Sequence, residues 1–145
     1  MEVREIMTID VETVAPEDTI QAAAEKMRSL DVGFLPICEN NKLVGTVTDR
    51  DIVIDVLGRD RDPAQVTVHE VMHHPVVVVD GTEDLTQALE RMRVHGVRRI
   101  PVMGSGRRLH GIISLDDLLR QLALHTTALA AVIEREQSLE QRTVR

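Results

Sequence analysis

A hydroxyl side chain and a carboxylate stand three residues apart in two similar segments, each of which reads Gly, two residues, Ser or Thr, two residues, Asp. These pairs are Thr48 with Asp51, and Ser114 with Asp117. A hydroxyl at the start of a helix lies beside unpaired backbone N–H groups and the positive end of the helix dipole, a setting that suits a phosphate. An aspartate one turn further on can accept hydrogen bonds from both hydroxyls of a ribose. The two pairs therefore predict two sites for a ligand that carries ribose and phosphate.

The same spacing also predicts a purely structural role. Ser or Thr at the N-cap and an acidic residue at the third helical position form a capping box, in which each side chain bonds the backbone N–H of the other residue. Capping and ligand binding are compatible roles for one pair of side chains. Both interpretations therefore stay open.

The segment from His69 to His73 matches the pattern H-E-x-x-H, in which two His hold zinc and Glu activates water. Pro75 ends any helix within two residues of His73, and no third ligand follows in a suitable context. Cys38, the single cysteine, has no placed base and fits a small buried hydrophobe. We therefore expect solvated histidines, no metal site and no catalytic residue, and the chain is predicted not to be an enzyme.

The two hydroxyl and carboxylate pairs belong to two copies of one unit. Residues 3–7 (VREIM) match residues 68–72 (VHEVM) at an offset of 65, and Pro36 matches Pro101 at the same offset. One inserted residue near Arg107 raises the offset to 66, at which Asp51 matches Asp117. A unit of this length cannot bury its own apolar face, so the copies must pack together. A ligand is therefore expected in a two-fold-related cleft between them.

Each copy is predicted to contain the same elements. For the first copy these are a strand at Thr13-Val14, a helix that Asp18 caps, strands over 32–38 and 43–48 around an Asn40-Asn41 turn, and a helix over 49–57 that Gly58 ends. For the second they are strands over 76–79, 98–102 and 109–114, a helix over 84–95, a turn at 104–106 and a helix from Leu115. The predicted organisation is a first repeat over 1–58, a linker over 59–67, a second repeat over 68–122 and a C-terminal helical extension over 123–145.

The last helix continues far beyond its counterpart in the first copy. Its apolar positions keep helical spacing, at Leu115, Leu118, Leu119, Leu122, Leu129, Val132 and Ile133. An amphipathic helix gains little stability without packing, so this stripe needs a surface to cover. Either the chain's own fold or another subunit can supply that surface.

Composition places the chain among soluble globular proteins, with 145 residues of which 43% are hydrophobic and 28% charged. No apolar run approaches the roughly 18 residues of a membrane span and the start lacks a signal-peptide pattern, so a cytoplasmic protein without membrane contact is expected. The formal net charge of -7 and the single aromatic residue, Phe34, argue against a nucleic-acid partner.

The two copies together resemble tandem CBS domains (a Bateman module) of the stand-alone bacterial or archaeal type. The resemblance rests on M-x-x-x-x-x-x-V near the start of each copy, a hydrophobic residue and Pro before the turn, and L-x-G-h-h-[ST]-x-x-D after it, and it covers residues 1 to about 122. It implies an α+β fold of two β-α-β-β-α units packed by pseudo-two-fold symmetry. It also implies adenosine-ligand sites in the cleft between the copies and frequent assembly into a homodimer.

The resemblance assigns roles to particular residues. Thr48 with Asp51, and Ser114 with Asp117, match the phosphate- and ribose-binding pairs. The segments that enclose the adenine correspond to Phe34, Leu35 and Pro36, and to Ile100 and Pro101, with Thr13 and Val14 as further ligand-binding positions. The basic pair that often precedes the hydrophobic residue and Pro in nucleotide-binding members is present only in the second copy, as Arg98 and Arg99. Neighbours on a strand point to opposite faces, so at most one of these arginines is expected in the cleft.

These observations predict a regulatory module that binds an adenosine-containing ligand and modulates an unidentified partner protein. AMP, ADP and ATP are the expected ligands, S-adenosylmethionine and NAD are further candidates, and no cofactor is required. The alternative is a structural module whose Ser/Thr and Asp pairs only cap helices and whose C-terminal helix mediates dimerisation or docking.

Overall fold

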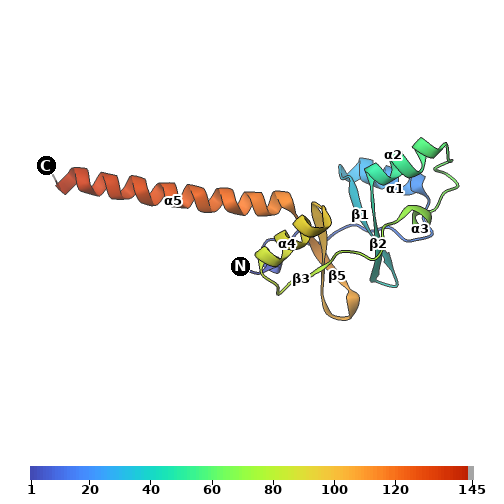
Figure 1. Cartoon of the computed structure of the whole chain (residues 1–145), viewed down its shortest axis with the longest axis horizontal. Helices are drawn as coiled ribbons and strands as arrows, with labels where there is room; N and C mark the ends of the chain where they lie inside the picture. Colours follow the sequence, from blue (N-terminus) through green and yellow to red (C-terminus); the bar gives the residue numbers. More distant parts are fainter. Residues whose placement is uncertain (144–145) are drawn as a thin grey trace.

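The computed structural model describes residues 1–143 and has the predicted α+β architecture (Figure 1). The first repeat contains helix α1 (Ile20–Leu30), the antiparallel strands β1 (Phe34–Glu39) and β2 (Lys42–Thr48), helix α2 (Asp49–Asp55) and the short turn η2 (Leu57–Arg59). The second repeat contains β3 (Val79–Asp80), α4 (Leu85–His95), β4 (Arg99–Met103), η3 (Ser105–Arg107), β5 (Leu109–Ser114) and α5 (Leu115–Thr143). Two further helical turns, η1 (Val3–Glu5) and α3 (Val68–Val71), lead into the repeats.

The sheets of the two repeats share one plan. In the first repeat β1 pairs with β2, and the chain turns between them at Asn40 and Asn41, whose positive φ angles of 52° and 61° agree with the predicted turn. In the second repeat β4 pairs antiparallel with β5 and parallel with β3. Each of these strand pairs ends at the hydroxyl residue that precedes the next helix, Thr48 before α2 and Ser114 before α5.

Each repeat is completed by the segment that leads into the other one. Val3 is fully buried in the core of the second repeat, and Val68 is fully buried in the core of the first. Backbone hydrogen bonds fix this exchange: Val3 N donates to the carbonyl of Glu83 at 2.9 Å, and Val68 N donates to the carbonyl of Asp18 at 2.8 Å. The two repeats are therefore interlocked and neither has a complete core of its own.

Helix α1 begins after Thr19, so the prediction that Asp18 caps it was wrong. Thr19 Oγ1 accepts a hydrogen bond from Ala22 N at 3.1 Å. Asp18 closes the preceding turn, where its carboxylate accepts a bond from Ala15 N at 2.9 Å. Both residue types cap helices well, so the sequence alone does not choose between them.

Three further boundaries differ from the prediction. Helix α2 ends at Asp55 and Gly58 lies inside η2, while Asp60 takes the left-handed conformation with φ of 54°. The strand predicted over 76–79 is reduced to the two residues of β3. The strand predicted at Thr13-Val14 is a single parallel bridge between Val14 and Ile37. The short strands reflect segments that cross between the repeats and pair over little of their length.

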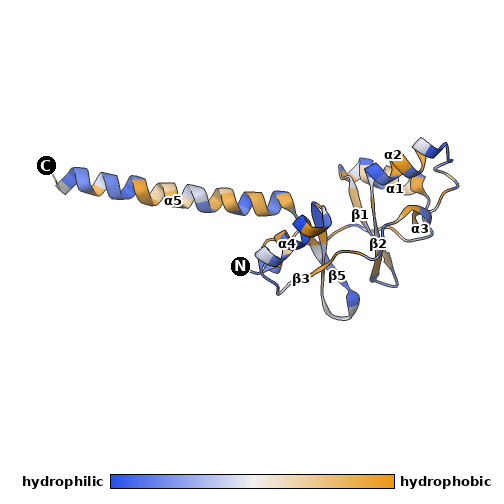
Figure 2. Cartoon of the chain, viewed as in Figure 1, coloured by the Kyte–Doolittle hydropathy of each residue, from blue (hydrophilic) through white to orange (hydrophobic). Residues whose placement is uncertain are grey.

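Helix α5 leaves the body of the molecule and extends away from it as one continuous helix (Figure 1). Its apolar residues are interspersed with polar ones along the whole projecting part (Figure 2). Leu122, Leu129 and Val132 are 62%, 67% and 66% exposed. Within residues 1–143 no helix, α5 included, has an apolar stretch long enough to cross a membrane.

Candidate functional site

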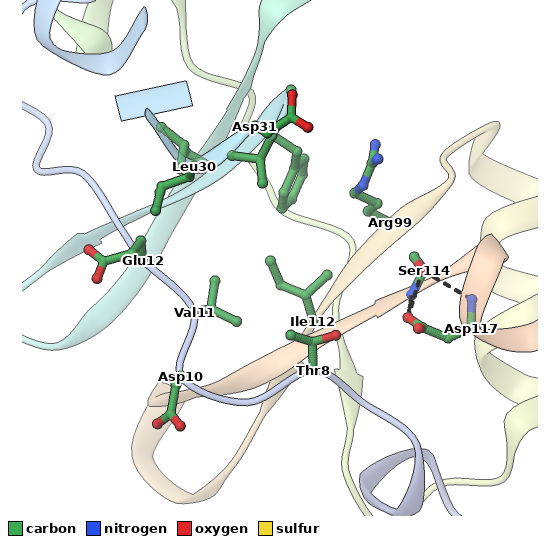
Figure 3. A pocket seen from close by; sticks show the side chains of 14 residues that line it. Thr8, Asp10, Val11, Glu12, Leu30, Asp31, Arg99, Ile112, Ser114 and Asp117 are labelled. Atoms are coloured by element: carbon green, nitrogen blue, oxygen red, sulfur yellow. Dashed lines mark hydrogen bonds between the residues drawn. The ribbon is translucent and has the colours of Figure 1, made fainter. Parts of the chain in front are cut away.

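A cavity of about 370 Å³ opens between the two repeats (Figure 3). One wall consists of residues 8 and 10–12 and residues 30–35, the latter running from the end of α1 into β1. The other wall belongs to the second repeat and consists of Arg99 on β4, Ile112 and Ser114 on β5, and Asp117 in the first turn of α5. We call this space the Asp117 cavity.

Ser114 and Asp117 form the predicted capping pair at the start of α5. Ser114 Oγ accepts a bond from Asp117 N at 3.2 Å, and Asp117 Oδ2 accepts bonds from Ser114 N at 2.8 Å and Ser114 Oγ at 2.6 Å. Within the described residues 1–143, the other carboxylate oxygen, Oδ1, meets only Arg120 Nη1, at 3.4 Å. Because the helix uses Oδ2, Asp117 Oδ1 remains able to accept hydrogen bonds from a ligand.

Thr48 and Asp51 form the equivalent pair at the start of α2. Asp51 Oδ2 accepts a bond from Thr48 N at 2.8 Å, and Thr48 Oγ1 accepts one from Asp51 N at 3.2 Å. Here the second oxygen is occupied, since Asp51 Oδ1 lies 2.6 Å from Nε2 of His73. Thr48 and Asp51 do not line the Asp117 cavity. We call their surroundings the Asp51 site.

Only one of the two neighbouring arginines lines the cavity. Arg99 lies on its wall, at the first residue of β4 (Figure 3). Arg98 is not among the lining residues, and its Nη2 lies 3.8 Å from Asp116 Oδ1 in an exposed ion pair. A ligand in the cavity therefore meets one guanidinium group from this pair.

The remaining predicted binding residues divide into two groups. Phe34 and Leu35 line the cavity. Pro36, Ile100, Pro101 and Val14 are buried and do not line it, and Thr13 is half-buried outside it. Pro36 lies on β1, and Ile100 and Pro101 lie on β4.

Several lining residues were not predicted from the sequence. Ile112 precedes Ser114 by two residues on one strand, so alternation along a strand was a signal that could have identified it. Thr8 and Val11 belong to the segment that crosses from the second repeat's core to the first. No local pattern indicates such a crossing, so these positions depended on the three-dimensional arrangement.

The charge of the cavity wall is predominantly negative. Among the lining residues within 1–143, Arg99 is the one cationic residue, whereas Asp10, Glu12, Asp31 and Asp117 are acidic (Figure 3). Lys26 lies nearby, with its Nζ 3.6 Å from Glu12 Oε2, and offsets part of that charge. The wall therefore favours a ligand with little negative charge.

The H-E-x-x-H segment does not place its two histidines on one helix. Helix α3 ends at Val71, and Met72 has extended φ and ψ angles of -64° and 150°. His69 lies on α3, whereas His73 forms a β-bridge with Thr46 on β2. Across residues 1–143 no three His, Cys, Asp or Glu side chains are grouped so that they could hold a metal ion.

Burial raises the pKa of the Cys38 thiol, which agrees with its expected role as a small hydrophobe.

Comparison with known proteins agrees with this architecture. The family model of the CBS domain matches residues 3–58 and again residues 68–124. Hypoxic response protein 1 of Mycobacterium tuberculosis is 41% identical over 123 residues, which cover 84% of this chain and 85% of that protein. A crystal structure of Hypoxic Response Protein I with two coordinated zinc ions has a TM-score of 0.77 and 39% identity, and covers 83% of this chain and 98% of the other.

Two other solved structures are similar to this chain. The CBS domain pair of protein MJ0100, in complex with 5′-methylthioadenosine and S-adenosyl-L-methionine, has a TM-score of 0.77 and 25% identity over 85% of this chain and 96% of that one. A hexameric CBS-CP12 protein from bloom-forming cyanobacteria has a TM-score of 0.72 and 32% identity, and covers 82% of this chain and 69% of its own. The duplicated sequence, the exchanged leading segments and the two family matches establish that the chain belongs to the CBS-domain family, with one CBS repeat in each copy.

Proposed function

We propose that the chain is a non-catalytic regulatory module that binds an adenosine-containing ligand in the Asp117 cavity. The observation that carries this proposal is the Asp117 carboxylate, whose Oδ2 caps α5 while its Oδ1 remains open to a ligand at the wall of a cavity of about 370 Å³. In this position Oδ1 accepts hydrogen bonds from the ribose hydroxyls. Phe34 lies on the opposite wall and supplies an apolar face for the adenine.

The charge of the wall narrows the class of ligand. Four acidic residues and one arginine line the cavity, so each added phosphate increases repulsion. A neutral or cationic adenosine derivative, such as 5′-methylthioadenosine or S-adenosylmethionine, fits this charge better than ATP. AMP is intermediate, because Arg99 can pair with a single phosphate. The ligands of the MJ0100 CBS pair support this order.

Calorimetric titration with 5′-methylthioadenosine, S-adenosylmethionine, AMP, ADP, ATP and NAD tests this proposal. Calorimetry is the suitable method because the chain has no Trp or Tyr for fluorescence. Asp117→Asn keeps a capping oxygen but weakens the acceptor that faces the ligand, so it should lower the affinity about tenfold or more. Asp51→Asn is the matched control. Equal binding by wild type and Asp117→Asn would refute the assignment of the cavity.

Regulation requires that the ligand prefers one arrangement of the repeats. Equal affinity for two arrangements would shift neither population, however tightly the ligand binds. The Asp117 cavity has walls from both repeats, so closing or opening it changes how the ligand is held. We propose that an unidentified partner protein reads this change.

We also propose that two copies of the chain associate through α5. Leu122, Leu129 and Val132 lie on one stripe of the helix and are more than half exposed. An antiparallel pairing that sets Leu129 beside Val132 of the second copy also sets His125 beside Glu136 of that copy. A parallel, in-register pairing would instead bring the two Glu136 side chains together, and like charges oppose it. Avoiding this repulsion favours a second, antiparallel copy as the partner of this face.

A further inference from the structure

We propose that His73 occludes the Asp51 site, so that one chain binds one adenosine-type ligand although its sequence contains two copies of the binding pair. This inference rests on the proposed function. The contact that carries it joins His73 Nε2 to Asp51 Oδ1 at 2.6 Å. The chain itself therefore closes the Asp51 site, whereas the corresponding site in the second repeat, the Asp117 cavity, is open.

The position of His73 is equivalent to that of Thr8 in the other copy. His73 and Thr46 exchange two backbone hydrogen bonds, of 2.9 and 3.2 Å, and Thr8 and Ile112 exchange two of 2.9 and 3.0 Å. The glycine next to each bridge allows this close approach in both copies. A Cβ on Gly45 would lie 3.1 Å from the His73 carbonyl oxygen, and one on Gly111 would lie 2.5 Å from that of Thr8.

The equivalent side chains differ in reach. Thr8 lines the Asp117 cavity and leaves it open (Figure 3). Within residues 1–143 no hydrogen bond joins the Thr8 side chain to Asp117, whose Oδ1 meets only Arg120 of its own helix. His73 is long enough to bond the corresponding oxygen of Asp51. One residue of the duplicated segment therefore distinguishes an open site from a closed one.

The His73 contact competes directly with a ligand for the same oxygen atom. Asp51 Oδ2 is already used by Thr48 N, so Oδ1 is the oxygen left for ribose hydroxyls. A carboxylate only accepts hydrogen bonds, so the His73 Nε2 carries the proton of this bond. Asp51 is 8% exposed, whereas the His73 side chain that contacts its Oδ1 is 65% exposed. A ribose must displace the imidazole before it reaches Asp51.

Exchanging the two equivalent residues tests the inference. In calorimetric titrations with 5′-methylthioadenosine, the wild-type chain should bind one ligand, and His73→Thr should bind two. The second binding event should disappear when Asp51→Asn is added to His73→Thr. His74→Thr is the control for loss of a neighbouring histidine, and it should bind one ligand with wild-type affinity.

The reciprocal change places the imidazole in the other copy. Thr8→His should lower affinity at the Asp117 cavity at least tenfold. The combination of Thr8→His with His73→Thr should again bind one ligand. Adding Asp51→Asn to this combination should weaken that binding, whereas adding Asp117→Asn should not. Thermal unfolding of each variant establishes that it is folded before titration. Wild type that binds two ligands, or folded His73→Thr that still binds one, would overturn the role of His73 and leave the proposed function standing. Absence of binding by both proteins would overturn both.

Discussion

Asp51 and Asp117 each use one carboxylate oxygen for the backbone of their own helix and leave the other for a further partner. The pairs of hydrogen bonds have nearly the same lengths, 2.8 and 3.2 Å, in the two copies. The capping interpretation and the ligand interpretation of the sequence therefore apply to different oxygens of one side chain. What differs between the copies is the neighbour of the second oxygen.

Removal of the hydroxyl from each capping pair should separate its structural role from its binding role. Ser114→Ala and Thr48→Ala each remove an oxygen that accepts a backbone N–H, so each should lower the free energy of unfolding by about 1 kcal/mol. Only Ser114→Ala should also change ligand affinity, because Ser114 lines the cavity. Urea unfolding and calorimetry measure the two effects. Equal effects of both substitutions on affinity would contradict the distinction.

The stability of the folded chain is expected to fall in acid because of Asp84, the N-cap of α4. Hydrogen bonds from the backbone and hydroxyl of Thr86, with a smaller contribution from the Met1 amino group, lower the pKa of Asp84 from 3.8 to about 2. Above pH 3.8 Asp84 is ionised in the folded and the unfolded chain, and its stabilising contribution is fully present. As the pH falls from 3.8 towards 2 the unfolded chain takes up the proton first, so that contribution is lost.

Asp84→Asn tests this pH dependence because it keeps a capping oxygen without the charge. Between pH 4.5 and 2 the wild type should lose more stability than the variant, as followed by urea unfolding with far-UV circular dichroism at each pH. Parallel stability curves for the two proteins over this range would show that Asp84 does not contribute to the acid sensitivity.

Among the helices and strands, the long and strongly periodic ones were predictable from sequence. Helix α4 matches its predicted range closely, and β5 matches it fully. The short elements were not: β3 has two residues, and α2 ends before Gly58. Strand pairing in these places depends on segments from the other repeat, which a local pattern does not contain. For the same reason the sequence did not indicate the roles of Thr8 and His73, which depend on β-bridges to β5 and β2.

The projecting part of α5 should govern self-association. Leu129→Glu places a charge in the middle of the exposed apolar stripe and should convert a dimer to a monomer, whereas Ser138→Glu adds the same charge on the opposite face of the helix and should not. Sedimentation equilibrium gives the mass of each protein. A dimer that persists in Leu129→Glu would exclude this stripe from the main interface.

The direction of the α5 pairing can be measured separately. In a Cys38→Ser background, Leu129→Cys together with Val132→Cys should form intermolecular disulfides under mild oxidation, because antiparallel helices bring these positions together. Leu129→Cys alone should cross-link poorly. Efficient cross-linking by the single variant would indicate parallel helices instead.

At the scale of the whole molecule, the exchange of leading segments makes the two repeats one folding unit. Val68 follows the linker in sequence, yet it is buried in the core of the first repeat, and Val3 is buried in that of the second. The duplication and the α+β class were predictable, because repeats of this size must pack together. The exchange of the leading segments was not predictable. Both leading segments carry the same apolar pattern, so each would bury its apolar residues equally well in its own repeat or in the other one.

Val68→Ala should therefore destabilise both repeats together. The loss of a fully buried side chain should lower the free energy of unfolding by about 2 kcal/mol. Unfolding in urea should remain a single transition when followed by far-UV circular dichroism and by hydrogen exchange in each repeat. Selective loss of protection in the first repeat alone would show that the repeats unfold independently.

A ligand that binds the folded chain should stabilise this unit as a whole. At a free concentration of 100 times the dissociation constant, one bound ligand adds about 2.7 kcal/mol to the free energy of unfolding. The midpoint of urea unfolding should rise with 5′-methylthioadenosine in wild type but much less in Asp117→Asn. Equal shifts in both proteins would place the ligand outside the Asp117 cavity.

The most direct test of the central claim is a crystal structure of the full chain grown with 5′-methylthioadenosine. We predict the nucleoside between the repeats, with a ribose hydroxyl about 2.5–3.0 Å from Asp117 Oδ1 and with His73 still on Asp51. A nucleoside bound at Asp51 with the Asp117 cavity empty, or one whose ribose does not reach Asp117, would contradict the account.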